Sequence, residues 1–223
     1  MKTLFTMNRK RDIVLGLLLT LFIISFAVVI TVFFKQLYYF DIDYLNIAQS
    51  TGLSKDMIKQ NYDVLIQYQS IFYKGSLQLP HFIMSETGRI HFEEVKRIFE
   101  MIQITCIVTG VISLIMIYQN HKQKEYRYLK LTSLFSIGIP TVIGFLAALD
   151  FDRAFVIFHK IVFRNDYWIF DYRSDPVITI LPEAFFMHCF IMIVLVVIVI
   201  SICLYIYYKH IQKQLLQDMF IDE

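Results

Sequence analysis

The sequence predicts an all-α membrane protein with four transmembrane helices and two extracytoplasmic loops that carry short interfacial helices. Hydrophobic residues make up 57% of the 223 residues and aromatic residues 16%, more than in an ordinary soluble domain. In addition, four stretches without a charged residue are long enough to cross a bilayer core, which takes about 20 apolar residues. These predicted spans are residues 13–34, 101–118, 131–149 and 184–208, within a single membrane domain 1–223.

The charge distribution predicts how the chain is oriented. Four basic residues precede the first span, and four more lie in the segment 119–130 against a single acidic residue. Short segments rich in lysine and arginine stay in the cytoplasm. We therefore expect both termini in the cytoplasm and the loops 35–100 and 150–183 outside. The net charge of +2 does not indicate a nucleic acid partner.

Helical patterns inside the two loops predict the interfacial helices. Ser54 is a plausible N-cap for a helix that ends before Gly75 and is too short to span. Residues 85–88 have the composition of a turn, and a helical period then begins at Ile90 and continues into the second span. In the second loop, residues 154–163 have the pattern of a short helix with one apolar side. Pro182 and Glu183 suit the start of the fourth span.

Two histidines in the outer loops, His91 and His159, are the candidate catalytic residues. Each occupies an apolar-facing position of a predicted helix, where a lone histidine is more often structural. Two of them on the same side of the membrane indicate function, because an ionisable group at membrane depth is costly. Glu94, one turn from His91, is placed to orient its ring. His188, at the start of the fourth span, is a weaker third candidate.

The sequence contains no motif of the common hydrolases, metalloproteases or nucleotide enzymes. G-x-S-x-G, H-E-x-x-H, a phosphate loop and paired C-x-x-C are all missing. Zinc ligation by His91, Glu94 and His159 is an alternative, but no ligand spacing specifies it, so we predict neither a metal nor a cofactor. The cysteines all lie in apolar spans and are interpreted as small packing residues without disulfides: Cys106, Cys189 and Cys203.

The stretch 158–186 combines the only tryptophan of the chain with many rings and charges, as expected of a polar site at a membrane surface. The arginines here are candidates to bind anionic or carbonyl oxygens, although a solvated or headgroup-facing arginine is equally expected. An alternative role for the aspartates is to order the loop. The candidate substrate-binding residues of both loops are Arg89, Glu94, Arg164, Asn165, Asp166, Trp168, Asp171, Arg173 and Asp175.

Several of these segments resemble the bacterial lipoprotein intramolecular transacylase family. The resemblance is carried by S-E-T-G-R-I-H-F-E-E-V-K at 85–96, F-H-K-I-V-F-R-N-D-Y-W-I-F-D at 158–171, D-P-V-I at 175–178 and L-P-E-A-F-F at 181–186. The four-helix arrangement extends it over essentially the whole chain. Glu94 departs from the aspartate that the family leads us to expect, and Tyr172 from a proline.

The resemblance implies an acyltransferase of the bacterial cytoplasmic membrane. It implies transfer of the sn-2 acyl chain of a diacylglyceryl-modified lipoprotein to the amine of its N-terminal cysteine, which leaves the lyso-form. The partners are then such lipoproteins and membrane lipids, and the family's two signature histidines match His91 and His159.

This reaction agrees with the chemistry of the candidate residues. Because the ester and the amine belong to one substrate, the enzyme only has to hold them in position for the amine to attack. No enzyme nucleophile is required. One histidine serves as the base, and the other serves as the acid or as a hydrogen-bond donor to the oxyanion. Which of the two histidines has which role is left open. Two other classes remain open: a different lipid acyltransferase or esterase, and a non-catalytic membrane sensor or assembly factor.

Overall fold

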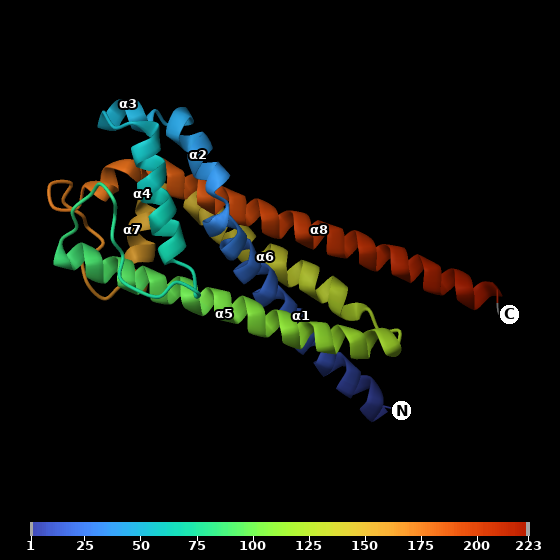
Figure 1. The fold of residues 1–223 in the computed structure, drawn as a ribbon. Helices are drawn as coiled ribbons and strands as arrows, with labels where there is room; N and C mark the ends of the chain where they lie inside the picture. Colours follow the sequence, from blue (N-terminus) through green and yellow to red (C-terminus); the bar gives the residue numbers. More distant parts are fainter. Residues whose placement is uncertain (1, 222–223) are drawn as a thin grey trace. The chain divides into compact units, whose positions relative to one another are not determined.

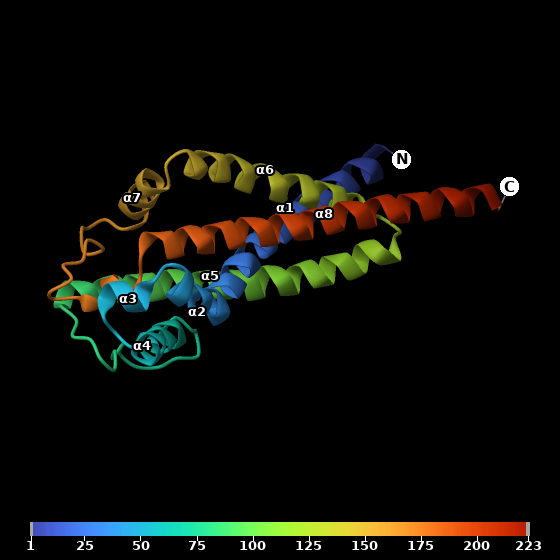
Figure 2. The same ribbon diagram turned by 90° about the horizontal axis from the view of Figure 1, so that it is seen from above.

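The computed structural model describes residues 2–221, and within this part of the chain all regular structure is helical. The order of the helices can be followed by colour in Figure 1 and Figure 2. They are α1 (Lys2–Phe33), α2 (Lys35–Tyr44), α3 (Ile47–Thr51), α4 (Lys55–Tyr68), α5 (Glu86–Lys122), α6 (Arg127–Leu149), α7 (Phe151–Val162), the 3-10 helix η1 (Pro176–Ile180) and α8 (Glu183–Ile221). The predicted all-α class is confirmed.

The four predicted spans fall on the four longest helices. α1, α5 and α8 comprise 32, 37 and 39 residues, and each contains a stretch long and apolar enough to cross a membrane. α6 comprises 23 residues, or about 34 Å at 1.5 Å per residue, which also exceeds the thickness of a hydrocarbon core. α1 ends at Phe33, one residue before the end of the first predicted span.

The chain divides into two compact units. The first, here called the helix unit, comprises Met1–Ala27, Ile104–Gly144 and Ile193–Glu223. The second, here called the loop unit, comprises Val28–Gln103 and Phe145–Met192. Both predicted outer loops, and therefore both candidate histidines, belong to the loop unit.

In the helix unit, the segment before the first span lies against the segment that joins α5 to α6. The guanidinium of Arg11 donates to Gln123 Oε1 at 2.6 Å and to Glu125 Oε2 at 3.0 Å. Asn120 Nδ2 donates to Asp12 Oδ1 at 3.2 Å, and both of these side chains are buried. The two basic segments of the sequence therefore lie at the same end of this unit.

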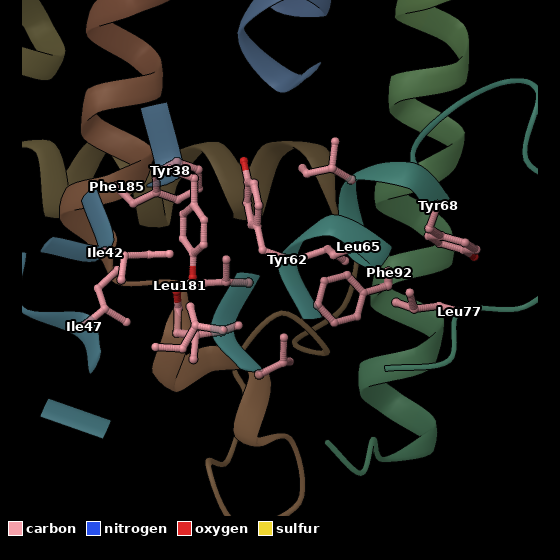
Figure 3. Close-up of a cluster of buried hydrophobic side chains, with 14 residues drawn as sticks. Tyr38, Ile42, Ile47, Tyr62, Leu65, Tyr68, Leu77, Phe92, Leu181 and Phe185 are labelled. Atoms are coloured by element: carbon pink, nitrogen blue, oxygen red, sulfur yellow. Dashed lines mark hydrogen bonds between the residues drawn. The ribbon is translucent and has the colours of Figure 1, made fainter. Parts of the chain in front are cut away.

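The loop unit has its own aromatic core, shown in Figure 3. Tyr38 of α2 stacks on Tyr62 of α4 with 3.7 Å between ring centroids, and Phe185 of α8 meets Tyr38 edge-on at 4.9 Å. The Tyr38 hydroxyl donates to the carbonyl of Ile180 in η1 at 2.6 Å. Phe92 of α5 belongs to the same cluster. This core therefore fixes the first part of α5, which carries the first candidate histidine.

The helix starts in the loops follow local side-chain chemistry. Ser54 caps α4 as predicted, accepting a hydrogen bond from Met57 N at 3.2 Å. α7 corresponds to the predicted helix 154–163 but begins three residues earlier, because Asp150 caps it by accepting from Arg153 N at 2.9 Å.

The turn expected from the composition of residues 85–88 is instead the start of a helix. α5 begins at Glu86, and Ser85 acts as its cap by accepting a hydrogen bond from Gly88 N at 3.0 Å. The serine and glycine that suggested a turn are therefore part of a helix start. α8 begins at Glu183, directly after Pro182, in agreement with the expected start of the fourth span to within one residue.

Candidate active site

His91 lies near the start of α5, in the charged part of the helix that precedes the predicted span 101–118. Its side chain is 6% exposed, and Nδ1 has no hydrogen-bond partner among the described residues. The ring centroids of Phe163 and Phe170 lie 4.7 and 5.4 Å from the His91 ring. Burial lowers the pKa of His91 to about 4, and the nearby His159 adds to this effect. His91 is therefore neutral at neutral pH.

His159 lies in the last turn of α7 and is half-buried. Its Nδ1 is 2.8 Å from the carbonyl oxygen of Phe155, and since a carbonyl only accepts, Nδ1 must donate. In the neutral ring, this leaves the lone pair on Nε2. Burial lowers the pKa of His159, while the hydrogen bond to Phe155 acts in the opposite direction. His159 therefore offers a neutral nitrogen that can accept a proton.

The structure brings the two predicted histidines together. Their ring centroids are 6.3 Å apart and their planes differ by 34°. The ring of Phe163 contacts both, at 4.7 Å from His91 and 5.6 Å from His159. The two imidazoles and the Phe163 ring therefore form one cluster of contacting rings.

The segment after α7 covers the His159 ring. Trp168 lies 4.8 Å from His159 between centroids, and its Nε1 donates to the carbonyl of Asn165 at 3.1 Å. The Asn165 amide in turn donates to Glu94 Oε1 at 2.9 Å, which ties this segment to α5. Glu94 therefore holds Asn165, and among the described residues it makes no hydrogen bond to His91, whose ring it was expected to orient. Glu94 Oε2 is buried and has no hydrogen-bond partner within residues 2–221.

Among the described residues, the hydrogen bonds of the three candidate aspartates are with the backbone or with Ser174 and do not involve the histidine rings. Asp175 is 2% exposed; its Oδ1 accepts from Ser85 N at 2.8 Å and its Oδ2 from Ser174 Oγ at 2.7 Å. Asp171 Oδ1 accepts from Arg173 N at 3.0 Å. Asp166 is exposed, and its main-chain carbonyl accepts from Ile169 N at 3.1 Å.

The three candidate arginines differ in their surroundings. Arg89 is bound by Glu86 and Glu93 on its own helix, so its charge is already compensated. Arg173 is exposed and rests on the neighbouring ring of Tyr172, 5.6 Å from its centroid. Arg164 is the one of the three that lines a hollow between α5 and the end of α7.

The sequence predicted some of the aromatic neighbours of the histidines and missed others. The sequence pattern already placed Phe155 and Phe163 on the face of His159, whereas nothing in it indicated that Phe170 would cover His91. His188, the weaker third candidate, is bound through Nδ1 to the fully buried Asp41, at 2.8 and 3.0 Å from its two oxygens. Within residues 2–221 no three His, Cys, Asp or Glu side chains are grouped as metal ligands, so the zinc alternative has no ligand set there.

Comparison with known proteins identifies the family. The family model described as lipoprotein intramolecular transacylase Lit matches residues 13–186. The structure of the membrane integral lipoprotein intramolecular transacylase Lit from Bacillus cereus is similar with a TM-score of 0.92 and 41% identity, over 94% of this chain and 97% of that one. No curated protein matches significantly.

Two variants of the Bacillus cereus enzyme are similar to the same degree. A variant with a histidine replaced by arginine matches with a TM-score of 0.89 and 39% identity, over 97% of both chains. A variant with a histidine replaced by alanine matches with a TM-score of 0.87 and 40% identity, over 96% of this chain and 97% of that one. The chain therefore belongs to the lipoprotein intramolecular transacylase family, whose members are integral membrane acyltransferases that act on lipoproteins.

Proposed function

We propose that this protein moves the sn-2 acyl chain of a diacylglyceryl-modified lipoprotein to the amine of the N-terminal cysteine and so produces the lyso-form. The observation that supports this most directly is the pair of neutral imidazoles, His91 and His159, with ring centroids 6.3 Å apart. Since ester and amine are held in one substrate, positioning supplies an effective molarity of about 10⁵ M or more without a covalent enzyme intermediate.

His159 is the general base in this proposal. Its Nδ1 donates to the Phe155 carbonyl, so the free lone pair is on Nε2. As the amine nitrogen attacks the ester carbonyl carbon, Nε2 takes one proton from it. The bond between the carbonyl carbon and the glycerol oxygen then breaks, and the same proton passes from Nε2 to that oxygen. An amide and a free hydroxyl result, and His159 is again neutral.

His91 stabilises the tetrahedral intermediate. Its lowered pKa, caused by burial, keeps it neutral, and a neutral imidazole still donates one N–H. Directed at the oxyanion from an apolar, water-poor surrounding, this donor is worth more than it would be in water. The rings of Phe163 and Phe170 provide that surrounding.

Of the other candidate residues, we propose that Glu94, Asn165, Trp168 and Arg164 surround the substrate. The first three are linked to one another and to His159, and Arg164 lines the adjacent hollow. For the remaining five we propose that they order the loops, because their contacts are with their own segments or with the start of α5: Arg89, Asp166, Asp171, Arg173 and Asp175.

The substrate reaches the site from the outer leaflet of the bacterial cytoplasmic membrane, with both termini of the protein in the cytoplasm. The contact between Arg11 and Gln123 supports a shared side for the two basic segments. α7 also leaves large apolar side chains exposed, Ile157 at 46%, Phe158 at 54% and Ile161 at 76%. Such a surface suits contact with membrane lipids and with the acyl chains of the substrate.

The test is transfer by the purified protein in lipid vesicles. A synthetic diacylglyceryl lipopeptide with a free N-terminal amine should be converted to the N-acyl lyso-lipopeptide, which mass spectrometry distinguishes by the position of the acyl chain. A lipopeptide with a blocked amine should not react. If phospholipid alone serves as acyl donor or is hydrolysed at the same rate, the protein acts as a different lipid acyltransferase or esterase.

A further inference from the structure

A hollow beside the histidine pair has charged walls. It has a volume of about 300 Å³. It is lined by Glu94, Arg97 and Ile98 of α5 and by Val162, Phe163 and Arg164 at the end of α7. Phe163 is shared with the site, since its ring lies 4.7 Å from His91 and 5.6 Å from His159. The hollow therefore begins one aromatic ring away from the reacting groups.

The two arginines of the hollow come from different elements. Both are exposed, and within residues 2–221 no hydrogen bond or ion pair engages the side chain of Arg97 or Arg164. Arg89 of the same helix is, by contrast, bound by two glutamates. Glu94 also lines the hollow, but its Oε1 accepts from Asn165 rather than from an arginine. Two free guanidinium groups at one hollow form a site for carboxylate and carbonyl oxygens, which arginine binds with two parallel donors.

We infer that this hollow binds the polypeptide that follows the N-terminal cysteine of the substrate, and that Arg97 and Arg164 favour an acidic residue in it. The inference rests on the proposed function, because only a substrate with a polypeptide attached beside the reacting amine has a chain to place here. Each residue of extended chain spans about 3.3–3.6 Å, so the first two or three residues after the cysteine suffice to pass the Phe163 ring.

The experiment compares three diacylglyceryl lipopeptides that differ only at the second residue after the cysteine, with glutamate, glutamine or lysine there. Wild-type protein in neutral lipid vesicles should show the highest kcat/KM with the glutamate peptide and the lowest with the lysine peptide. An exposed ion pair contributes up to about a fivefold change, so we expect a two- to fivefold step between successive peptides. Higher salt should reduce the preference.

Substitutions of Arg97 and Arg164 test whether the preference for the acidic peptide comes from the hollow. In the Arg97→Gln/Arg164→Gln double variant the ratio of kcat/KM between the glutamate and lysine peptides should fall towards one. In the Arg97→Glu/Arg164→Glu variant the order should reverse. Lys160→Glu is the matched control, because Lys160 is an exposed basic residue of α7 outside the hollow. It should keep the wild-type ratio.

The possible failures are distinguishable. Equal rates for the three peptides in the wild type, or an unchanged ratio in the double glutamine variant, would overturn the inference while the transfer reaction still stands. An effect of Lys160→Glu as large as that of the arginine variants would also overturn it, since the preference would then come from general surface charge. The absence of transfer from all three peptides would reject the proposed function, and this inference with it.

Discussion

At the residue scale, the hydrogen bond from His159 Nδ1 to the Phe155 carbonyl determines which nitrogen acts as the base. Because burial lowers the pKa of His159 below its ordinary value near 6.5, the neutral form that accepts a proton persists to lower pH than in a free histidine. A pH profile can detect this difference.

We therefore predict a profile of log kcat/KM with two acid limbs. Below about pH 8 it should fall with slope one, since the substrate α-amine, with a pKa of about 8, becomes protonated. A second proton should steepen the fall only below about pH 6.5, where His159 is protonated. The measurement is kcat/KM against pH with a diacylglyceryl lipopeptide in vesicles. Steepening above pH 6.5 would show that the histidine base has a raised pKa, contrary to this account.

At the element scale, the start of α5 is held by a carboxylate from the other loop. Asp175 accepts from Ser85 N at 2.8 Å, and its negative charge at the first turn favours the helix. The approach is so close that a Cβ built on Gly88 would lie 2.2 Å from Asp175 Oδ1. This contact fixes the segment of α5 that carries His91.

We predict that Asp175→Ala destabilises the protein by about 1.5–3 kcal/mol, the usual loss for a hydrogen bond to a charged group. Gly88→Ala should have a similar effect, because its methyl group would displace the carboxylate. Thermal unfolding in detergent checks both variants. Asp166→Ala is the control, since the side chain of Asp166 is exposed and its loop contact is made by the main-chain carbonyl, which alanine keeps. Wild-type stability of both variants would mean that this contact does not hold the helix.

At the scale of the whole molecule, the sequence predicted the long helices well because each depends on a local run of apolar residues. The periodicity also placed His91 and His159 on apolar helical faces; their catalytic role remains a prediction. The sequence could not predict that Asn165 binds Glu94 or that Asp175 binds Ser85 at the start of α5. These contacts join residues 71 and 90 positions apart, and no local pattern encodes such pairs. The same limitation made the start of α5 look like a turn.

The orientation in the membrane gives a further prediction at this scale. In a variant without the native cysteines, Lys124→Cys should be shielded from a membrane-impermeant thiol reagent in intact cells, whereas Ser76→Cys should react. Both positions are exposed in the structure, so burial in the protein does not explain a difference. Labelling of the Lys124→Cys variant from outside would reverse the orientation and place the histidines in the cytoplasm.

The central claim is that His91 and His159 act together in one proton-transfer sequence. It is tested most directly by mass spectrometry of lipoprotein N-termini from cells that express His91→Ala, His159→Ala or the double variant at matched membrane levels. Each single variant should lose about 10²–10⁴-fold in lyso-form production. The double variant should be little worse than the poorer single one, because the two residues act as a unit. Cys106→Ala should retain activity. Wild-type amounts of lyso-form from either histidine variant would contradict the mechanism.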